Sequence, residues 1–189
     1  MIPKAKPKAP RHVVQAAALA EWMKEDRGPM PEFYLLGVRG YYRDTMGKTG
    51  VNDRGIYDDA IFVVGPETFV AFNANTDPSF FRKGIATLAT GFHAYRPGNH
   101  GISRPGGGYP AFRPATRNEE LPVTRDGVKA PWPGVAINIH RGGYRTTSSE
   151  GCQTIHPSQW DAFHALVSME LGKLGLKKFW YGLIDGPIV

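Results

Sequence analysis

Gly134-Val-Ala-Ile-Asn-Ile-His140 is followed, after Arg141-Gly-Gly-Tyr144, by Ser149-Glu-Gly-Cys-Gln153, and the expected architecture is built around these residues. The apolar alternation before His140 predicts a strand that carries the histidine at its end. The turn-rich residues that follow lead to Cys152, the only cysteine among 189 residues. A thiolate is a strong nucleophile, and an adjacent imidazole commonly helps to form it. We therefore expect a histidine and a cysteine to meet here.

The residues around the cysteine favour chemistry over packing. A lone cysteine is most often a small buried hydrophobe. Here its neighbours are Ser149, Glu150, Gly151 and Gln153, which is not the composition of a core. Gly151 leaves space beside the sulfur and lets backbone N–H groups face an oxyanion. A single cysteine also excludes an intramolecular disulfide framework.

This pattern resembles the catalytic signature of the L,D-transpeptidases, the YkuD-type domains that act on peptidoglycan stem peptides. His140, Ser149, Gly151 and Cys152 fall on the positions of the family's His-Gly-type element and its Ser-x-Gly-Cys element. The resemblance implies Cys152 as nucleophile, His140 as general base, and the backbone around Gly151 and Cys152 as the oxyanion site. Ala89-Thr90-Gly91 is a weaker echo of the family's Ser-Thr-Gly element. The chain resembles a divergent, phage-like member.

The chain departs from the family pattern at two positions. Arg141 follows the histidine where the family usually has glycine, and Thr154 stands where the family usually has arginine. Stem peptides carry carboxylates, which are costly to bury without a cationic partner. We therefore expect at least one of Arg141, Arg145 and Arg113 to point into the cleft beside the cysteine.

Residues 91–118 are rich in Gly, Pro, Arg and His and predict a long functional loop. His100 and Tyr109 of this segment are expected to border the cleft, and His100 is the second choice for the base. His93, His100 and His140 together raise the possibility of zinc, but no metal-binding spacing accompanies them. We therefore expect neither a metal site nor a cofactor.

The overall pattern predicts a mainly β, α+β protein. The resemblance implies an L,D-transpeptidase-like β-sandwich with an N-terminal helix and a second helix after the cysteine. We expect a basic Lys/Pro tail over residues 1–11 and a single catalytic domain over residues 12–189. A helix is predicted over residues 12–26, and Pro157 is well suited to begin the second. Strands are predicted over residues 33–38, 60–64, 68–72, 85–90, 121–124, 135–139 and 178–184.

The net charge of +6 and the pI of about 9.5 favour an anionic partner. No basic helix or aromatic-interleaved motif is present, so we expect no nucleic-acid partner. No apolar run reaches the roughly 18 residues of a membrane span, so we expect no membrane insertion. Cell-wall polymers are acidic, so a cell-wall partner would agree with the positive net charge of the protein.

The N-terminal residues are basic, but the apolar run that follows is short and interrupted by Gln15. We interpret this segment as an amphipathic helix and not as a signal peptide. The protein is then expected to be made in the cytoplasm and to act on the wall after release through a holin or a secretion system.

The sequence therefore predicts a cysteine acyl-enzyme whose partner is the peptidoglycan stem peptide. Hydrolysis, as in an endopeptidase or carboxypeptidase of a phage endolysin or a delivered toxin, is favoured over cross-linking. The alternatives are an L,D-transpeptidase that forms cross-links, and a non-catalytic wall-binding or virion protein on the same fold. A papain-like protease is disfavoured because its cysteine precedes its histidine.

Overall fold

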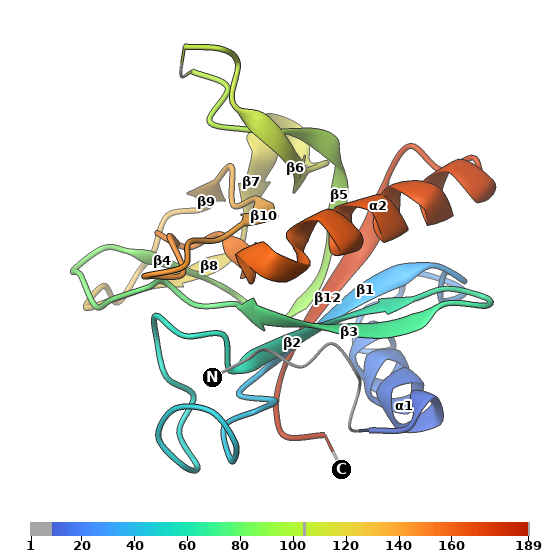
Figure 1. Ribbon diagram of the computed structural model, residues 1–189, viewed down its shortest axis with the longest axis horizontal. Helices are drawn as coiled ribbons and strands as arrows, with labels where there is room; N and C mark the ends of the chain where they lie inside the picture. Colours follow the sequence, from blue (N-terminus) through green and yellow to red (C-terminus); the bar gives the residue numbers. More distant parts are fainter. Residues whose placement is uncertain (1–8, 104, 189) are drawn as a thin grey trace.

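Eight strands form a single sheet that closes on itself, in a computed structural model that describes residues 9–103 and 105–188 (Figure 1). Their bounds are β1 (Tyr34–Arg39), β2 (Asp59–Val64), β3 (Phe69–Asn75), β5 (Gly91–His100), β6 (Tyr109–Pro114), β10 (Ile139–Arg141), β11 (Gln153–Ile155) and β12 (Phe179–Asp185). Around the ring the order is β1, β12, β5, β6, β10, β11, β3 and β2.

The mainly β, α+β class is confirmed, but the strands do not separate into the two sheets of the expected sandwich. β1 pairs with both β2 and β12, and β10 and β11 join β6 to β3. Each of these eight strands therefore has a neighbour on both sides, which leaves no unpaired edge in the ring.

Two helices, α1 (Arg11–Trp22) and α2 (Pro157–Lys173), pack on opposite faces of the closed sheet (Figure 1). The first lies mainly against β12 and β5, and the second mainly against β3, β10 and β11. Successive strand residues point to opposite faces, so Leu35 packs in the cluster that contains α2, and Leu36 in the cluster that contains α1. The core is therefore double, with one layer inside the closed sheet and one beneath α1.

The helix boundaries follow local signals in one case and not in the other. The second helix begins at Pro157, as predicted, and the side chain of His156 accepts a hydrogen bond from the Ser158 N–H at its start. The first helix ends at Trp22 and not at residue 26.

The expected tail over residues 1–11 lies mainly outside the described residues. No helix in residues 9–103 or 105–188 has the length and apolar character to cross a bilayer.

The segment expected to be a long loop, residues 91–118, contains both paired strands of a β-hairpin, β5 and β6. β5 and β6 pair from Tyr95 opposite Pro114 to His100 opposite Tyr109. Gly98 makes this possible, since a Cβ there would lie 2.7 Å from Cδ of Arg113. The glycine and prolines that suggested a loop are therefore accommodated within paired strands.

Two small two-stranded sheets and a short helical turn lie outside the closed sheet. The chain expected to be one strand over residues 134–140 is broken at Ala136, whose φ of 54° is left-handed. The elements are β4 (Ala86–Leu88) paired with β8 (Val123–Arg125), β7 (Glu120–Leu121) paired with β9 (Gly134–Val135), and a 3-10 turn η1 (Arg117–Glu119).

Candidate functional site

The parallel pairing of β10 and β11 brings the histidine and the cysteine together. His140 lies opposite Thr154, and Cys152 directly precedes β11. The Gln153 N–H donates to the Asn138 carbonyl at 2.9 Å, which extends the pairing toward the cysteine. Because side chains alternate along a strand, His140, Thr154 and Cys152 share one face. The predicted meeting of His140 and Cys152 is therefore present.

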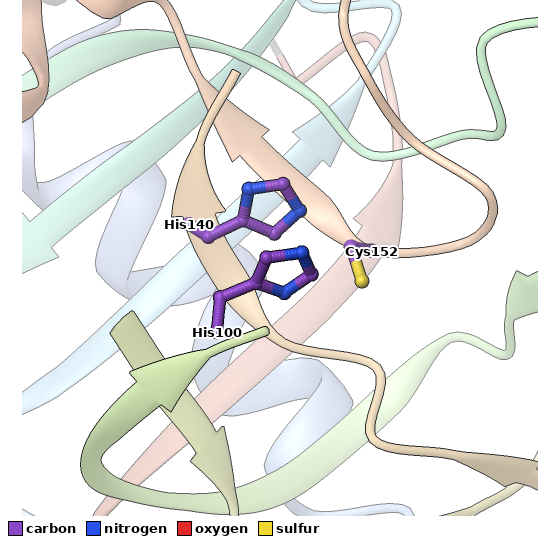
Figure 2. Close-up of side chains that lie close together, drawn as sticks. All are labelled: His100, His140 and Cys152. Carbon is purple, nitrogen blue, oxygen red and sulfur yellow. The ribbon is translucent and has the colours of Figure 1, made fainter. Parts of the chain in front are cut away.

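His100 joins them from the end of β5. Its ring stacks on that of His140, with centroids 3.9 Å apart and planes 20° from parallel. One ring nitrogen of each histidine and the Cys152 sulfur all lie within 4.8 Å of one another (Figure 2). We call these three residues the His-His-Cys cluster. His93, the third histidine considered for zinc, lies elsewhere, with Nε2 2.9 Å from the Ala89 carbonyl oxygen.

The contacts of the His140 ring favour the tautomer that a general base requires. Its Nδ1 lies 2.8 Å from the carbonyl oxygen of Arg141 and 3.0 Å from the hydroxyl of Tyr109. An Nδ1–H that donates to the Arg141 carbonyl leaves the lone pair on Nε2. Tyr109, expected to face the cleft, therefore lies beside the ring and helps to orient it.

Ser149 holds the cysteine loop in place and is itself buried. Its hydroxyl donates to the Cys152 carbonyl at 2.7 Å and accepts from the Gly151 N–H at 3.1 Å. Its own N–H donates to the Ser79 hydroxyl at 2.8 Å. The Gly151 N–H is therefore already engaged, which corrects the expectation that it serves an oxyanion. Among the described residues no partner is found for the Cys152 N–H, so this amide remains for that role.

Glycine is required immediately before the cysteine. Gly151 has a φ of 129°, where an L side chain is strained. A Cβ at this position would lie 2.7 Å from the carbonyl oxygen of Ala86. The backbone of β4 thus packs directly on the residue that precedes the nucleophile candidate.

A cleft of about 510 Å³ opens above the His-His-Cys cluster, and Arg82, Arg125 and Glu150 bring charge to its lining. Arg82 is largely exposed and forms an ion pair with Glu150 at 3.1 Å. Arg125 is held more firmly, because its guanidinium donates to the carbonyls of Gly84, Trp132 and Pro133. The guanidinium of Arg82 is therefore free to move at the rim of the cleft, whereas that of Arg125 is held in one position.

The three arginines expected in this cleft lie elsewhere. Arg113 is buried, and its guanidinium donates to Glu119 and to the Asn99 carbonyl, each at 2.8 Å. Arg145 lines a separate hollow beside Tyr57. Arg141 is exposed and borders a smaller hollow of about 300 Å³ that shares His100 and His140 with the cleft. The sequence singled out neither Arg82 nor Arg125, since no local pattern distinguishes them from the chain's other cations.

The surroundings of Cys152 keep its thiol protonated. Burial raises the pKa of the Cys152 thiol to about 11, although the backbone N–H of Asn138 and the charge of Arg113 act in the opposite direction. A thiolate that is already formed near neutral pH requires a lowered pKa, which these surroundings do not provide. The geometry instead suits a thiol that loses its proton to a histidine as the sulfur attacks.

Replacing Gly151 by alanine is expected to destabilise the protein by about 1–3 kcal/mol, because the new methyl group enforces a strained φ and contacts Ala86. The free energy of unfolding in denaturant measures this effect. Gly172→Ala is the matched control, since nothing lies within 4 Å of a Cβ there in α2. Helix propensity should make the control neutral or more stable by up to about 1 kcal/mol. Equal effects of the two changes would contradict the assigned role of Gly151.

Alkylation of Cys152 in the folded protein should accelerate about tenfold per pH unit and continue to do so up to a pKa of about 11. The physical reason is that only the thiolate reacts and burial disfavours it. The rate is measured with an uncharged alkylating reagent between pH 6 and 11. The same protein in denaturant serves as control, and its reaction rate should level off above a thiol pKa of about 8.5. A plateau reached below pH 8 in the folded protein would contradict this environment.

Comparison of the chain with known proteins adds no relative from which its chemistry could be taken. The structural evidence consists of the His-His-Cys cluster, the loop that holds it and the charged cleft above it. No family model, no curated protein and no solved structure matches this chain.

Proposed function

We propose that the chain is a cysteine acyl-enzyme that hydrolyses peptidoglycan stem peptides, and that its closed sheet is a divergent form of the L,D-transpeptidase-like fold. The observation that carries the proposal is the approach of Cys152 to His140 and His100 within 4.8 Å at a cleft large enough for a peptide. A nucleophile, a base and a binding cleft in one place are what acyl transfer requires.

In the acylation step, His140 accepts the thiol proton through Nε2 while the sulfur attacks a peptide carbonyl carbon. The C–S bond forms as the carbonyl becomes an oxyanion, which the Cys152 N–H can stabilise. The oxyanion then collapses, the C–N bond breaks, and the His140 imidazolium gives its proton to the leaving amine. A thioester on Cys152 and a free amine remain.

In the deacylation step, the same imidazole takes a proton from a water molecule that attacks the thioester. The C–S bond breaks, a carboxylic acid leaves, and the proton returns to the Cys152 sulfur. An amine of a second stem peptide in place of water would give a cross-link. The polar, open cleft gives water direct access to the cluster.

Arg82 is the proposed anchor for a substrate carboxylate. Its side chain is 54% exposed and its partner, Glu150, is 67% exposed, so the pair can open without leaving a buried charge. Arg125 is less suited, because three backbone carbonyls already hold its guanidinium. The net charge of +6 further favours binding to an acidic wall polymer. Delivery to the wall through a holin or a secretion system is part of this proposal.

The second candidate is a non-catalytic wall-binding or virion protein with the same cleft. It is favoured by one observation, the burial that raises the pKa of the Cys152 thiol to about 11. Loss of the thiol distinguishes the two candidates, since it abolishes turnover but leaves binding to the wall unchanged.

Cys152→Ala should abolish the release of muropeptides from purified sacculi, and Cys152→Ser should be nearly inactive because a hydroxyl is far less acidic than a thiol. His140→Ala should lower kcat by about 10²–10⁴. Mass analysis of the released fragments identifies the bond cleaved and detects any new cross-link. A circular dichroism spectrum shows that each variant is folded. Undiminished release by folded Cys152→Ala would overturn the proposed function.

Arg82→Ala should lower kcat/KM on muropeptides about tenfold, equivalent to roughly 1.4 kcal/mol of transition-state stabilisation. Lys83→Ala is the control, because it removes a neighbouring exposed charge that does not line the cleft. Methyl esterification of the substrate carboxylates should remove the difference between Arg82→Ala and the parent. If Arg82→Ala and Lys83→Ala lose activity equally, only the overall electrostatic field of the protein matters and the assignment of Arg82 as anchor is wrong.

A further inference from the structure

The His-His-Cys cluster contains the donor set of a metal site as well as that of a cysteine enzyme. Thiolate sulfur and imidazole nitrogen are the ligands that zinc prefers. The three donors come from the end of β5, from β10 and from the residue before β11. No short spacing motif could reveal them, because three separate parts of the chain supply them.

The distances require only a small contraction to hold a zinc ion. Bond lengths of about 2.0–2.1 Å to nitrogen and 2.3 Å to sulfur place tetrahedral ligand atoms roughly 3.3–3.6 Å apart. The cluster atoms lie within 4.8 Å of one another. The two imidazole rings are already stacked at 3.9 Å, so modest rotation of each side chain brings the donors into range.

The groups around the histidines match those that orient metal ligands in proteins. A zinc-bound histidine usually donates its second ring N–H to a carbonyl or carboxylate oxygen. Nδ1 of His140 lies 2.8 Å from the Arg141 carbonyl oxygen, which suits Nε2 as the ligand atom. Nδ1 of His100 lies 3.0 Å from the side-chain amide of Asn138.

Asn138 supplies an independent indication. It is 2% exposed, and its Oδ1 is buried without a hydrogen-bond partner among the described residues. The oxygen and nitrogen of an amide are told apart only by their hydrogen bonds. Turning the amide by about 180° would let Oδ1 accept from an Nδ1–H of His100 and leave Nε2 for a metal. This turn gives Oδ1 a partner and sets the second histidine in the ligating tautomer, while Nδ2 takes the buried place that Oδ1 held.

We propose that His100, His140 and Cys152 bind a zinc ion whose fourth ligand is a water molecule from the cleft, and that the ion reversibly blocks the nucleophile. The inhibitory part rests on the proposed function, whereas the metal site does not. Binding replaces the S–H bond of Cys152 by an S–Zn bond and releases one proton to solvent. Bound zinc occupies the sulfur and both imidazoles, so attack on a carbonyl requires prior loss of the ion.

The test uses the full chain after removal of metal with a chelator. Cobalt(II) is added first, because a thiolate-to-cobalt charge-transfer band reports a metal–sulfur bond directly. Zinc affinity is then measured by competition with a chromophoric chelator. We expect one ion per chain, and at least ~100-fold weaker binding in His100→Ala, His140→Ala and Cys152→Ser. His12→Ala is the matched control, since that histidine is exposed on α1 and should leave binding unchanged.

Two further measurements make the outcome decisive. Asn138→Ala should weaken zinc binding by about 10-fold or more, because it removes the oxygen that orients His100. Zinc should also protect Cys152 from alkylation in the parent but not in His100→Ala. Absence of the charge-transfer band, or a band unchanged in His100→Ala, would overturn the zinc site.

Activity separates the two proposals. Metal-free protein that releases muropeptides and binds no zinc would contradict the zinc site and leave the proposed function intact. Protein that binds zinc at the cluster but is inactive both with and without the metal would contradict the proposed function and leave the site intact. Activity that is unaffected by zinc bound at the cluster would contradict the inhibitory role alone.

Discussion

The parallel pairing of β10 with β11 is the contact on which the candidate site depends. Parallel neighbours usually need a crossover of a dozen or more residues, often a helix. Residues 142–152 make this connection without a helix or strand. A residue with left-handed backbone and a hydrogen bond from another loop help to shape it. Ser148 adopts a φ of 55°, and the Tyr57 hydroxyl donates to the Gly143 carbonyl at 2.7 Å. The loop over residues 40–58 thereby supports the cysteine loop from outside the sheet.

The same pairing places Thr154, two residues after Cys152, in a packed polar layer. Thr154 lies between Asn75 on β3 and His140 on β10, and all three side chains are buried. A guanidinium at this position would need to place its charge within a packed polar layer. The cationic groups at the cleft come instead from its rim, where Arg82 remains in contact with solvent.

Local signals predicted the parts of the structure that local chemistry determines. Pro157 located the start of α2, and the pattern around His140 and Cys152 predicted that these two residues meet. The hairpin of β5 and β6 was missed because its glycines and prolines are typical of loops, and only the crossing of Arg113 over Gly98 reveals their role. His100 was expected to lie in a long functional loop for the same reason, although it ends a strand.

Charge placement was the least predictable part, since the arginines of the cleft are brought there by tertiary structure alone. Arg113 is buried and bound to Glu119, whereas Arg125 reaches the cleft from β8, in a small sheet outside the ring. A single sequence contains no pattern that separates a structural ion pair from a solvent-facing cation. The same limit hid the His-His-Cys cluster as a ligand set, because its members are distant in sequence.

The closed sheet supplies two residues of the His-His-Cys cluster, and the small sheets described above supply walls of the cleft. His100 and His140 belong to the closed sheet, whose ring of hydrogen bonds resists change at any one strand. Two walls of the cleft belong instead to β4 and β8 and to β9, short pairs outside that ring. The buried side chains of these pairs, Leu88 and Val123 among them, pack in the main core, whereas Val135 on the cleft wall is 61% exposed. Substitution at exposed wall positions can therefore change what the cleft binds without disturbing the packing that holds the cluster beneath it.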